Sequence, residues 1–223
     1  MQEVQNDPAL TLQIVVTGMH LSPEFGLTYQ FIEADGFPIT RKVDMLTTSD
    51  SATGIAKSIG KGTTAFGQVF EDLKPDLVLV LGDRFELLAV VSAALVSRVP
   101  VGHIHGGEVT EGAFDEAIRH AITKMAHLHF ASTEIYRNRI IQLGENPRHV
   151  FNVGAPGIDN IRCLDFLDRP SLEKELRVDL GGRSLLVTWH PVTWEPGRTK
   201  LQFQYLLEVL EKLDDIKLIF TKA

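Results

Sequence analysis

The stretch VPVGHIHGGEVTEGAFDEAIRHAITK, residues 99–124, decides the fold because it joins a predicted strand to a predicted helix through a tight glycine turn. A short apolar strand carries His103 and His105 to its carboxyl end, and the two glycines that follow let the backbone turn sharply. A helix then begins at Asp115. Ligands of open α/β folds bind at the carboxyl ends of the strands, so this stretch predicts one wall of a ligand site.

Apolar and helical segments alternate along the rest of the chain. Short apolar, β-branched runs of the kind found in buried parallel strands occupy residues 12–17, 77–81, 99–104, 128–131, 150–153, 185–188 and 216–220. Helical patterns occupy residues 85–96, 115–126, 134–143 and 200–213. This alternation predicts an α/β fold with a Rossmann-like, doubly wound parallel sheet.

The domain organisation follows from a polar segment, residues 162–182, which contains Asp-Arg-Pro and Gly-Gly. We expect a Rossmann-like domain at 1–165, a linker at 166–183 and the beginning of a second Rossmann-like domain at 184–223. Residues 1–7 resemble the tail of a helix, so we expect a leading strand and its phosphate-facing loop to be missing. The second domain has too few elements to bury a sheet alone.

Composition excludes several classes of protein. A chain of 223 residues with 44% hydrophobic residues has enough apolar material for a sizeable core, and no apolar run reaches the length of a membrane span. The net charge of −7 argues against a broad nucleic-acid surface. One cysteine, Cys163, allows no internal disulfide. We therefore expect a cytoplasmic protein that binds neither nucleic acid nor membranes.

Asp83 and Arg84 lie between the strand at 77–81 and the helix at 85–96. A cation at a helix N-terminus opposes the helix dipole, and a bound anion explains its presence there. On that interpretation Arg84 and the helix hold a pyrophosphate, and Asp83 faces a sugar carbon. The alternative is that Asp83 caps the helix and Arg84 is solvated.

Two acid–cation pairs with a spacing of four residues open the helix at 115–126. Asp115 and Arg119 form one pair, and Glu116 and His120 form the other. They are either surface salt bridges or part of a site. Because the helix follows a glycine turn at a strand end, we interpret Asp115 as catalytic and Arg119 as the cation that holds it ionised.

Several histidines add to the polar groups at strand ends. His103 and His105 alternate along a strand, so they are expected on one face, and together with His127 and His129 they leave a metallohydrolase as a competing interpretation. His20 and His190 also follow predicted strands. No carboxylate–histidine signature completes a metal site, and we predict none.

Five segments resemble the hydrolysing UDP-N-acetylglucosamine 2-epimerase family, in the branch that serves sialic-acid and legionaminic-acid synthesis. They are VVTGMHLSPEFG, LVLGDRFELLA, VGHIHGGEVTEGAFDEAIRHAITKMAHLHFASTE, VGAPGIDNI and LLVTWHPVTWE. The resemblance implies two Rossmann-like domains in the GT-B arrangement, with UDP between them. It also implies a homodimer for the full-length protein and no metal or nicotinamide cofactor.

The resemblance further implies a mechanism. A base removes the proton from sugar carbon 2 while UDP leaves carbon 1, and water adds to the resulting glycal with inversion at carbon 2. The implied catalytic residues are Asp83 and Asp115, with His105, Glu116 and His20 nearby and Arg119 organising the carboxylates. The implied substrate-binding residues are Arg84, His190, Gly107 and Glu108.

The chain departs from the family pattern in two ways. Many sialic-acid members carry Glu at the position of His105, and this difference can mark the subgroup that acts on a UDP-2,4-diacetamido-trideoxy sugar. The family pattern also extends beyond both ends of the chain. A non-catalytic UDP-sugar-binding remnant and a GT-B glycosyltransferase are the remaining alternatives, and a glycosyltransferase would leave the carbon 2 proton in place.

Overall fold

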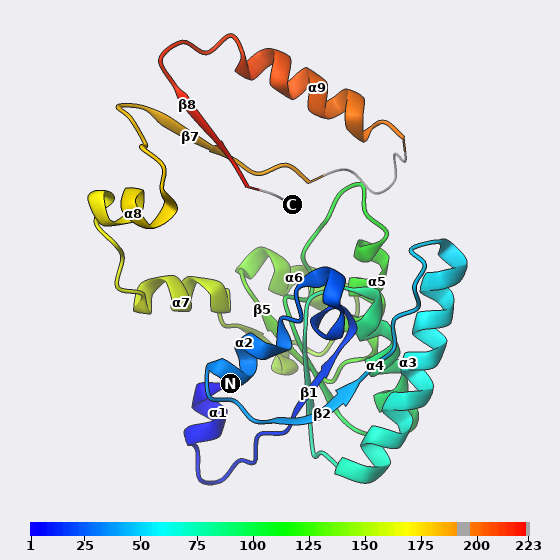
Figure 1. The fold of residues 1–223 in the computed structure, drawn as a ribbon. Helices are drawn as coiled ribbons and strands as arrows, with labels where there is room; N and C mark the ends of the chain where they lie inside the picture. The colour runs from blue at the N-terminus through cyan, green and yellow to red at the C-terminus, as the bar shows by residue number, and fades with distance from the viewer. Residues whose placement is uncertain (191–196, 222–223) are drawn as a thin grey trace. The chain divides into compact units, whose positions relative to one another are not determined.

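The computed structural model describes residues 1–190 and 197–221. The chain divides into two compact units, one comprising Met1–Val109 and Asp115–Ala155, the other Thr110–Phe114 and Pro156–Ala223 (Figure 1). The domain limits expected from the sequence, at 1–165, 166–183 and 184–223, stay a prediction.

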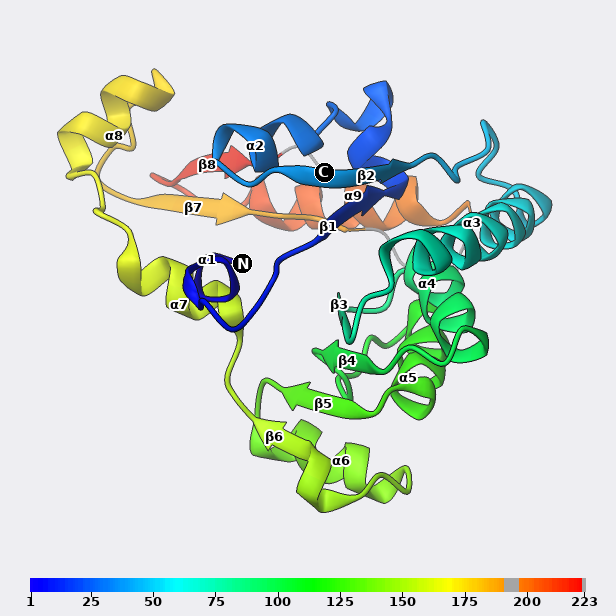
Figure 2. The same cartoon turned by 90° about the horizontal axis from the view of Figure 1, so that it is seen from below.

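Parallel strands form the framework of the first unit. They are β1 (Ile14–Thr17), β2 (Ile39–Val43), β3 (Val78–Leu81), β4 (Val101–Ile104), β5 (Leu128–Ala131) and β6 (Val150–Asn152). β1 pairs with β2, and β3, β4, β5 and β6 pair in that order, all in parallel (Figure 2). The predicted α/β fold with parallel strands is confirmed, but this unit divides its strands between two sheets where one was expected.

The helices of the first unit connect and cover these strands. They are α1 (Gln2–Asn6), α2 (Tyr29–Ala34), α3 (Ala52–Leu73), α4 (Phe85–Val96), α5 (Asp115–Met125) and α6 (Glu134–Gln142), with short 3-10 turns η1 (Gly18–Leu21), η2 (Pro23–Phe25) and η3 (Pro147–His149). The predicted helices at 85–96, 115–126 and 134–143 are confirmed, as is the helical character of residues 1–7. None of the described helices is long and apolar enough to cross a membrane.

The main core lies where α3 and α4 pack side by side against the sheets (Figures 1 and 2). Met45 is fully buried there, together with Val80 of β3 and Val101 of β4. The sequence predicted a buried strand at β3, but Leu79 and Leu81 are 50% and 56% exposed. The strand therefore alternates between a core face and an open face.

The strand β2 and the helices α2 and α3 of this unit were not predicted from the sequence. β2 has the sequence ITRKV, whose three central residues are polar and exposed, so no apolar run marks it. Helix α3 contains four glycines, and its buried face includes Gly54, Ser58 and Gly62 before the apolar Phe66. Small residues in place of large apolar ones hide the helical period of this segment.

The second unit contains α7 (Pro156–Cys163), α8 (Arg169–Leu176), β7 (Ser184–Val187), α9 (Thr199–Leu210) and β8 (Lys217–Phe220). β7 and β8 are parallel partners, and the ring of Phe203 lies 6.0 Å from that of Trp189 and 6.2 Å from that of Phe220. The strands predicted at 185–188 and 216–220 and the helix at 200–213 are confirmed. Helices α7 and α8 were not predicted, and α8 lies within the expected linker.

Substitutions at two glycines of α3 test how this helix packs against α4. A Cβ at Gly62 would lie 3.0 Å from Ala89 Cβ and 2.6 Å from Met45 Cε, whereas a Cβ at Gly60 meets nothing within 4 Å. We expect Gly62→Ala to lower the free energy of unfolding in urea by about 1–3 kcal/mol through overpacking. Gly60→Ala, the matched control, should raise it by roughly 0.5–1 kcal/mol. Equal effects of the two substitutions would contradict this packing.

Candidate active site

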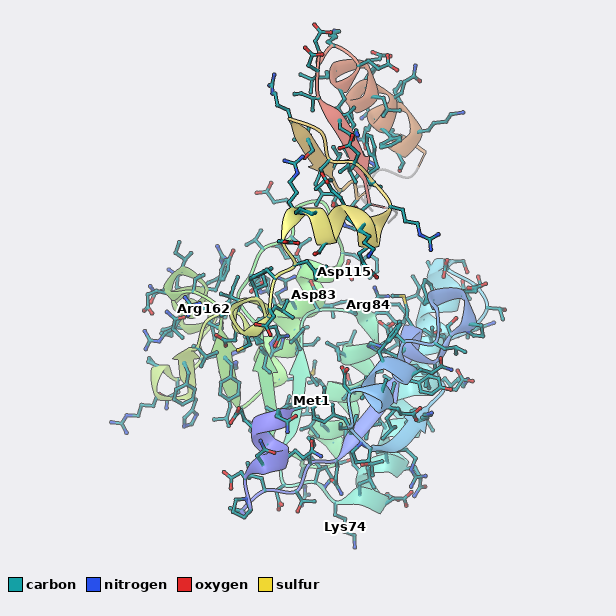
Figure 3. The ribbon with its side chains drawn as sticks, turned by 60° about the vertical axis from the view of Figure 1, so that its left-hand side comes forward. Met1, Lys74, Asp83, Arg84, Asp115 and Arg162 are labelled. Atoms are coloured by element: carbon teal, nitrogen blue, oxygen red, sulfur yellow. The ribbon has the colours of Figure 1, made fainter. Side chains whose placement is uncertain are left out.

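Charged side chains of the first unit gather at the carboxyl ends of β3 and β4. Asp83 and Arg84 directly follow β3 and one glycine, and Asp115 is the first residue of α5. Figure 3 shows these three residues at one end of the sheet, with Lys74, which ends α3, at the opposite end. The strand-end site predicted from the sequence is therefore assembled from separate segments of the chain.

Arg119 of α5 is the cation at the centre of this cluster. Its side chain is only 7% exposed, and its guanidinium forms an ion pair with Asp83. Its Nη1 also lies 3.5 Å from Oε2 of Glu108, in the loop after β4. A buried guanidinium needs such counterions, because burial of an unpaired charge is costly. Arg119 thereby links α5 to the segments that follow β3 and β4.

The pKa of Asp115 is raised above its usual value, first by partial burial and then by the negative charge of Asp83. The positive charges of Arg84 and Arg119 act in the opposite direction and do not outweigh these two effects. Arg119 therefore favours the ionised form of Asp115, as predicted, but its effect is smaller than those of burial and of Asp83. Two neighbouring carboxyl groups whose environments differ are suited to separate acid and base roles.

Arg84 is the N-cap residue of α4, and its side chain is 52% exposed. Its Nε lies 3.2 Å from Oε2 of Glu86, which is almost fully buried, and its Nη2 lies 3.3 Å from Sδ of Met19. The alternative interpretation is wrong for Asp83, which pairs with Arg119 and does not cap α4. It holds in part for Arg84, which is half exposed to solvent but also has a carboxylate partner.

His103 is a buried structural residue beneath the site. Its Nε2 lies 2.8 Å from the carbonyl oxygen of Gly82, and its Nδ1 lies 3.1 Å from Oγ1 of Thr123. Burial lowers the pKa of His103 to about 4, despite the opposing hydrogen bond to Gly82. A carbonyl only accepts hydrogen bonds, so the neutral ring donates from Nε2 to Gly82 and has its lone pair on Nδ1, beside the Thr123 hydroxyl. This bond fixes the turn that precedes Asp83.

Strand alternation predicted that His103 and His105 lie on one face, but His105 lies outside the strand. β4 ends at Ile104, and His105 has a left-handed backbone with φ of 65°. Its Nδ1 lies 2.5 Å from Oε1 of Glu108. Separate partners also engage His127, whose Nδ1 accepts from the backbone N–H of Val101, and His129, whose Nε2 lies 3.2 Å from Glu145.

Within residues 1–190 and 197–221, no three His, Cys, Asp or Glu side chains form a group that would hold a metal ion. Of the four histidines that the sequence offered as ligands, His103 lies on β4 and His105 directly after it. His127 lies directly before β5, and His129 lies on that strand. The structure thus does not assemble the metal site of the competing metallohydrolase interpretation from its described residues.

The remaining predicted site residues differ in how closely they join the cluster. Gly107 has φ of 76°, and a Cβ there would lie 2.5 Å from the carbonyl oxygen of Tyr136, so the turn requires glycine. Glu116 lies 3.8 Å from His120, which confirms the second predicted pair of α5. His20 is exposed, and its Nδ1 lies 2.7 Å from Oγ1 of Thr28.

His190 follows β7 in the second unit and is exposed. The rest of its sequence motif, from Pro191 to residue 195, lies outside the described residues. The assignment of His190 to UDP binding therefore stays a prediction.

Two residues at the cluster were missed in the sequence. Ser132 directly follows β5, and its hydroxyl donates to Oε1 of Glu108 across 2.6 Å. Glu86 pairs with Arg84 from the first turn of α4. The strand-end rule that identified Asp83 applies equally to Ser132, so its position after a predicted strand was a usable signal.

The chain matches one protein family along almost its whole length. The family model for UDP-N-acetylglucosamine 2-epimerases matches residues 2–223. The chain is 48% identical over 221 residues to the GDP/UDP-N,N'-diacetylbacillosamine 2-epimerase (hydrolyzing) of Campylobacter jejuni, covering 99% of this chain and 57% of that protein. It is 40% identical to the UDP-N,N'-diacetylbacillosamine 2-epimerase (hydrolyzing) of Legionella pneumophila, covering 89% and 52%. The chain thus spans about half the length of these relatives.

A crystal structure supports the same fold. The UDP-GlcNAc 2-epimerase of Neisseria meningitidis, bound to UDP-GlcNAc, superposes with a TM-score of 0.79 at 20% identity, covering 98% of this chain and 60% of that one. At this level of identity the similarity establishes the fold alone.

The coupling between the two carboxyl groups can be measured directly. In Asp83→Asn, the pKa of Asp115 should fall because the neighbouring negative charge is gone and the positive charges near it remain. Titration of the side-chain carboxyl carbon by NMR reports this value. Asp76→Asn, which neutralises an exposed aspartate before β3, is the control and should leave it unchanged. An Asp115 pKa that stays constant or rises in Asp83→Asn would refute the coupling.

Proposed function

The chain belongs to the UDP-N-acetylglucosamine 2-epimerase family, and from this premise we propose that the protein is a hydrolysing UDP-sugar 2-epimerase. The observation that carries the proposal is the juxtaposition of Asp83 and Asp115 at the carboxyl edge of the sheet, beside the buried Arg119. Proton abstraction next to a departing phosphate needs such a pair of carboxyl groups and a source of positive charge.

The proposed substrate is a UDP-2,4-diacetamido-trideoxy sugar of the diacetylbacillosamine type. The two relatives at 48% and 40% identity carry that substrate in their names. UDP-N-acetylglucosamine is the second substrate to be compared, because it names the family as a whole. The product would serve the synthesis of legionaminic-type or sialic-type acids.

The first half of the reaction is an elimination. A carboxylate takes the proton from sugar carbon 2, the electrons of that C–H bond form the C1=C2 double bond, and the bond from carbon 1 to the UDP oxygen breaks. We assign this proton transfer to Asp83 and Asp115. Burial and the charge of Asp83 favour the protonated form of Asp115, which suits a group that must also return a proton.

The second half of the reaction is a hydration. Water supplies a hydroxyl group to carbon 1, and carbon 2 receives a proton on the opposite face, so the free sugar is released as the 2-epimer. His105, Glu116 and His20 are assigned to proton transfer near this face, and Arg119 to the organisation of the carboxylates.

The leaving UDP needs positive charge and hydrogen-bond donors. We assign its diphosphate to Arg84, which is half exposed at the N-terminus of α4, where the helix dipole favours an anion. His190, Gly107 and Glu108 complete the proposed substrate contacts. The mechanism uses no metal or nicotinamide. A cytoplasmic location and a homodimer in the full-length form belong to the same proposal, which the family resemblance supports.

Incubation with each UDP-sugar in deuterated water tests the proposal. We expect UDP release and a 2-epimerised free sugar that carries deuterium at carbon 2, with the diacetamido substrate turned over faster. Asp115→Asn should lower the rate at least about 100-fold, the usual contribution of an acid/base group. Asp76→Asn is the matched control, because it neutralises an exposed aspartate far from the site.

The outcomes separate the alternatives. UDP release with the carbon 2 proton retained and the sugar passed to an acceptor would indicate a glycosyltransferase. UDP-sugar binding without UDP release would indicate a non-catalytic binding protein. Either result overturns the epimerase proposal.

A further inference from the structure

The loop after β4 holds His105 in an unusual position. His105 has φ of 65°, a left-handed conformation that side-chain-bearing residues rarely adopt, and its backbone N–H donates to the carbonyl oxygen of Phe130 across 3.1 Å. The imidazole is therefore directed by the turn and not by the alternation of the strand. Its side chain retains 22% exposure, so the ring is accessible to solvent.

Glu108 is the group that this turn brings to His105. Its Oε1 lies 2.5 Å from Nδ1 of His105 and accepts from the Ser132 hydroxyl at 2.6 Å, while its Oε2 faces Arg119 at 3.5 Å. Burial raises the pKa of Glu108, but the hydrogen bonds from Ser132 and His105 and the charge of Arg119 together lower it. Glu108 is therefore an ionised carboxylate at neutral pH.

An ionised carboxylate only accepts hydrogen bonds, so the short contact requires a proton on Nδ1 of His105. In the neutral ring, a proton on Nδ1 leaves the lone pair on Nε2. Among the described residues Nε2 has no hydrogen-bond partner, in contrast to His103, both of whose ring nitrogens are engaged. The contact geometry thus prepares Nε2 of His105 to accept a proton.

We propose that Glu108 and Ser132 are positioning residues that hold His105 as the Nδ1–H tautomer, with Nε2 directed to accept a proton in the reaction. This inference rests on the proposed epimerase function and deepens it. It reassigns Glu108 from substrate binding to the support of His105, and it gives Ser132 a role in the same support.

Long-range proton–nitrogen NMR of the histidine rings, at about pH 8, reads the tautomer directly. The signals of His105 are assigned by their loss in His105→Gln. We expect the Nδ1–H form in the unmodified protein and a shift towards Nε2–H in Glu108→Ala, since free histidine side chains are not restricted to Nδ1–H. Glu111→Gln alters an exposed glutamate of the same loop and should change nothing.

Two milder variants keep the test decisive if Glu108→Ala does not fold. Glu108→Gln places an amide beside Nδ1 that can donate to it, so the Nε2–H fraction should rise. Ser132→Ala removes one hydroxyl and should also raise that fraction, whereas Ser97→Ala, at the exposed end of α4, should not. An Nε2–H ring in the unmodified protein, or a tautomer that none of these substitutions at Glu108 and Ser132 changes, would overturn the proposal.

Kinetics distinguish this inference from the proposed function itself. In Ser132→Ala we expect kcat for UDP release to fall about tenfold with KM unchanged, the pattern of a lost transition-state interaction. A change in KM alone would contradict a positioning role. If the unmodified protein releases no UDP, the proposed function fails, while the tautomer of His105 still decides whether Glu108 and Ser132 position it.

Discussion

The buried guanidinium of Arg119 determines how the charged side chains are arranged at the carboxyl edge of the four-stranded sheet. Arg119 lies almost wholly out of solvent, where an unpaired charge would be strongly destabilising. Asp83, from the end of β3, and Glu108, from the loop after β4, provide the negative charge that it needs. Helix α5 is thereby fixed to two separate strand ends, and the positions of the neighbouring ionisable groups follow from that attachment.

Each carboxylate that faces Arg119 also acts on a second group. The negative charge of Asp83 contributes to the raised pKa of Asp115, so it favours the protonated form of that carboxyl group. Glu108 turns its other oxygen to His105, within a loop whose backbone is left-handed. A single buried cation thus organises two pairs of groups suited to proton transfer. This is the structural basis on which the proposed elimination and hydration rest.

Much of the fold could be predicted from short apolar runs and from polar residues at strand ends. The ion-pair and hydrogen-bond partners of the site residues could not. Spacing of four residues along α5 paired Arg119 with Asp115, whereas the sheet brings Asp83, 36 positions earlier in the chain, to the guanidinium. The left-handed turn at His105 and the contact of Ser132 with Glu108 likewise depend on tertiary structure. Local periodicity describes one element at a time, so it cannot report such contacts.

A double-mutant cycle between Arg119 and Asp83 tests the central claim most directly. The free energies of unfolding of Arg119→Gln, Asp83→Asn and the double variant are measured in urea against the unmodified protein. If the buried pair holds the site together, either single substitution should cost about 3 kcal/mol and the two should couple by at least about 1.5 kcal/mol. Effects that add to within about 0.5 kcal/mol would show that the pair does not act as a unit and would contradict the account.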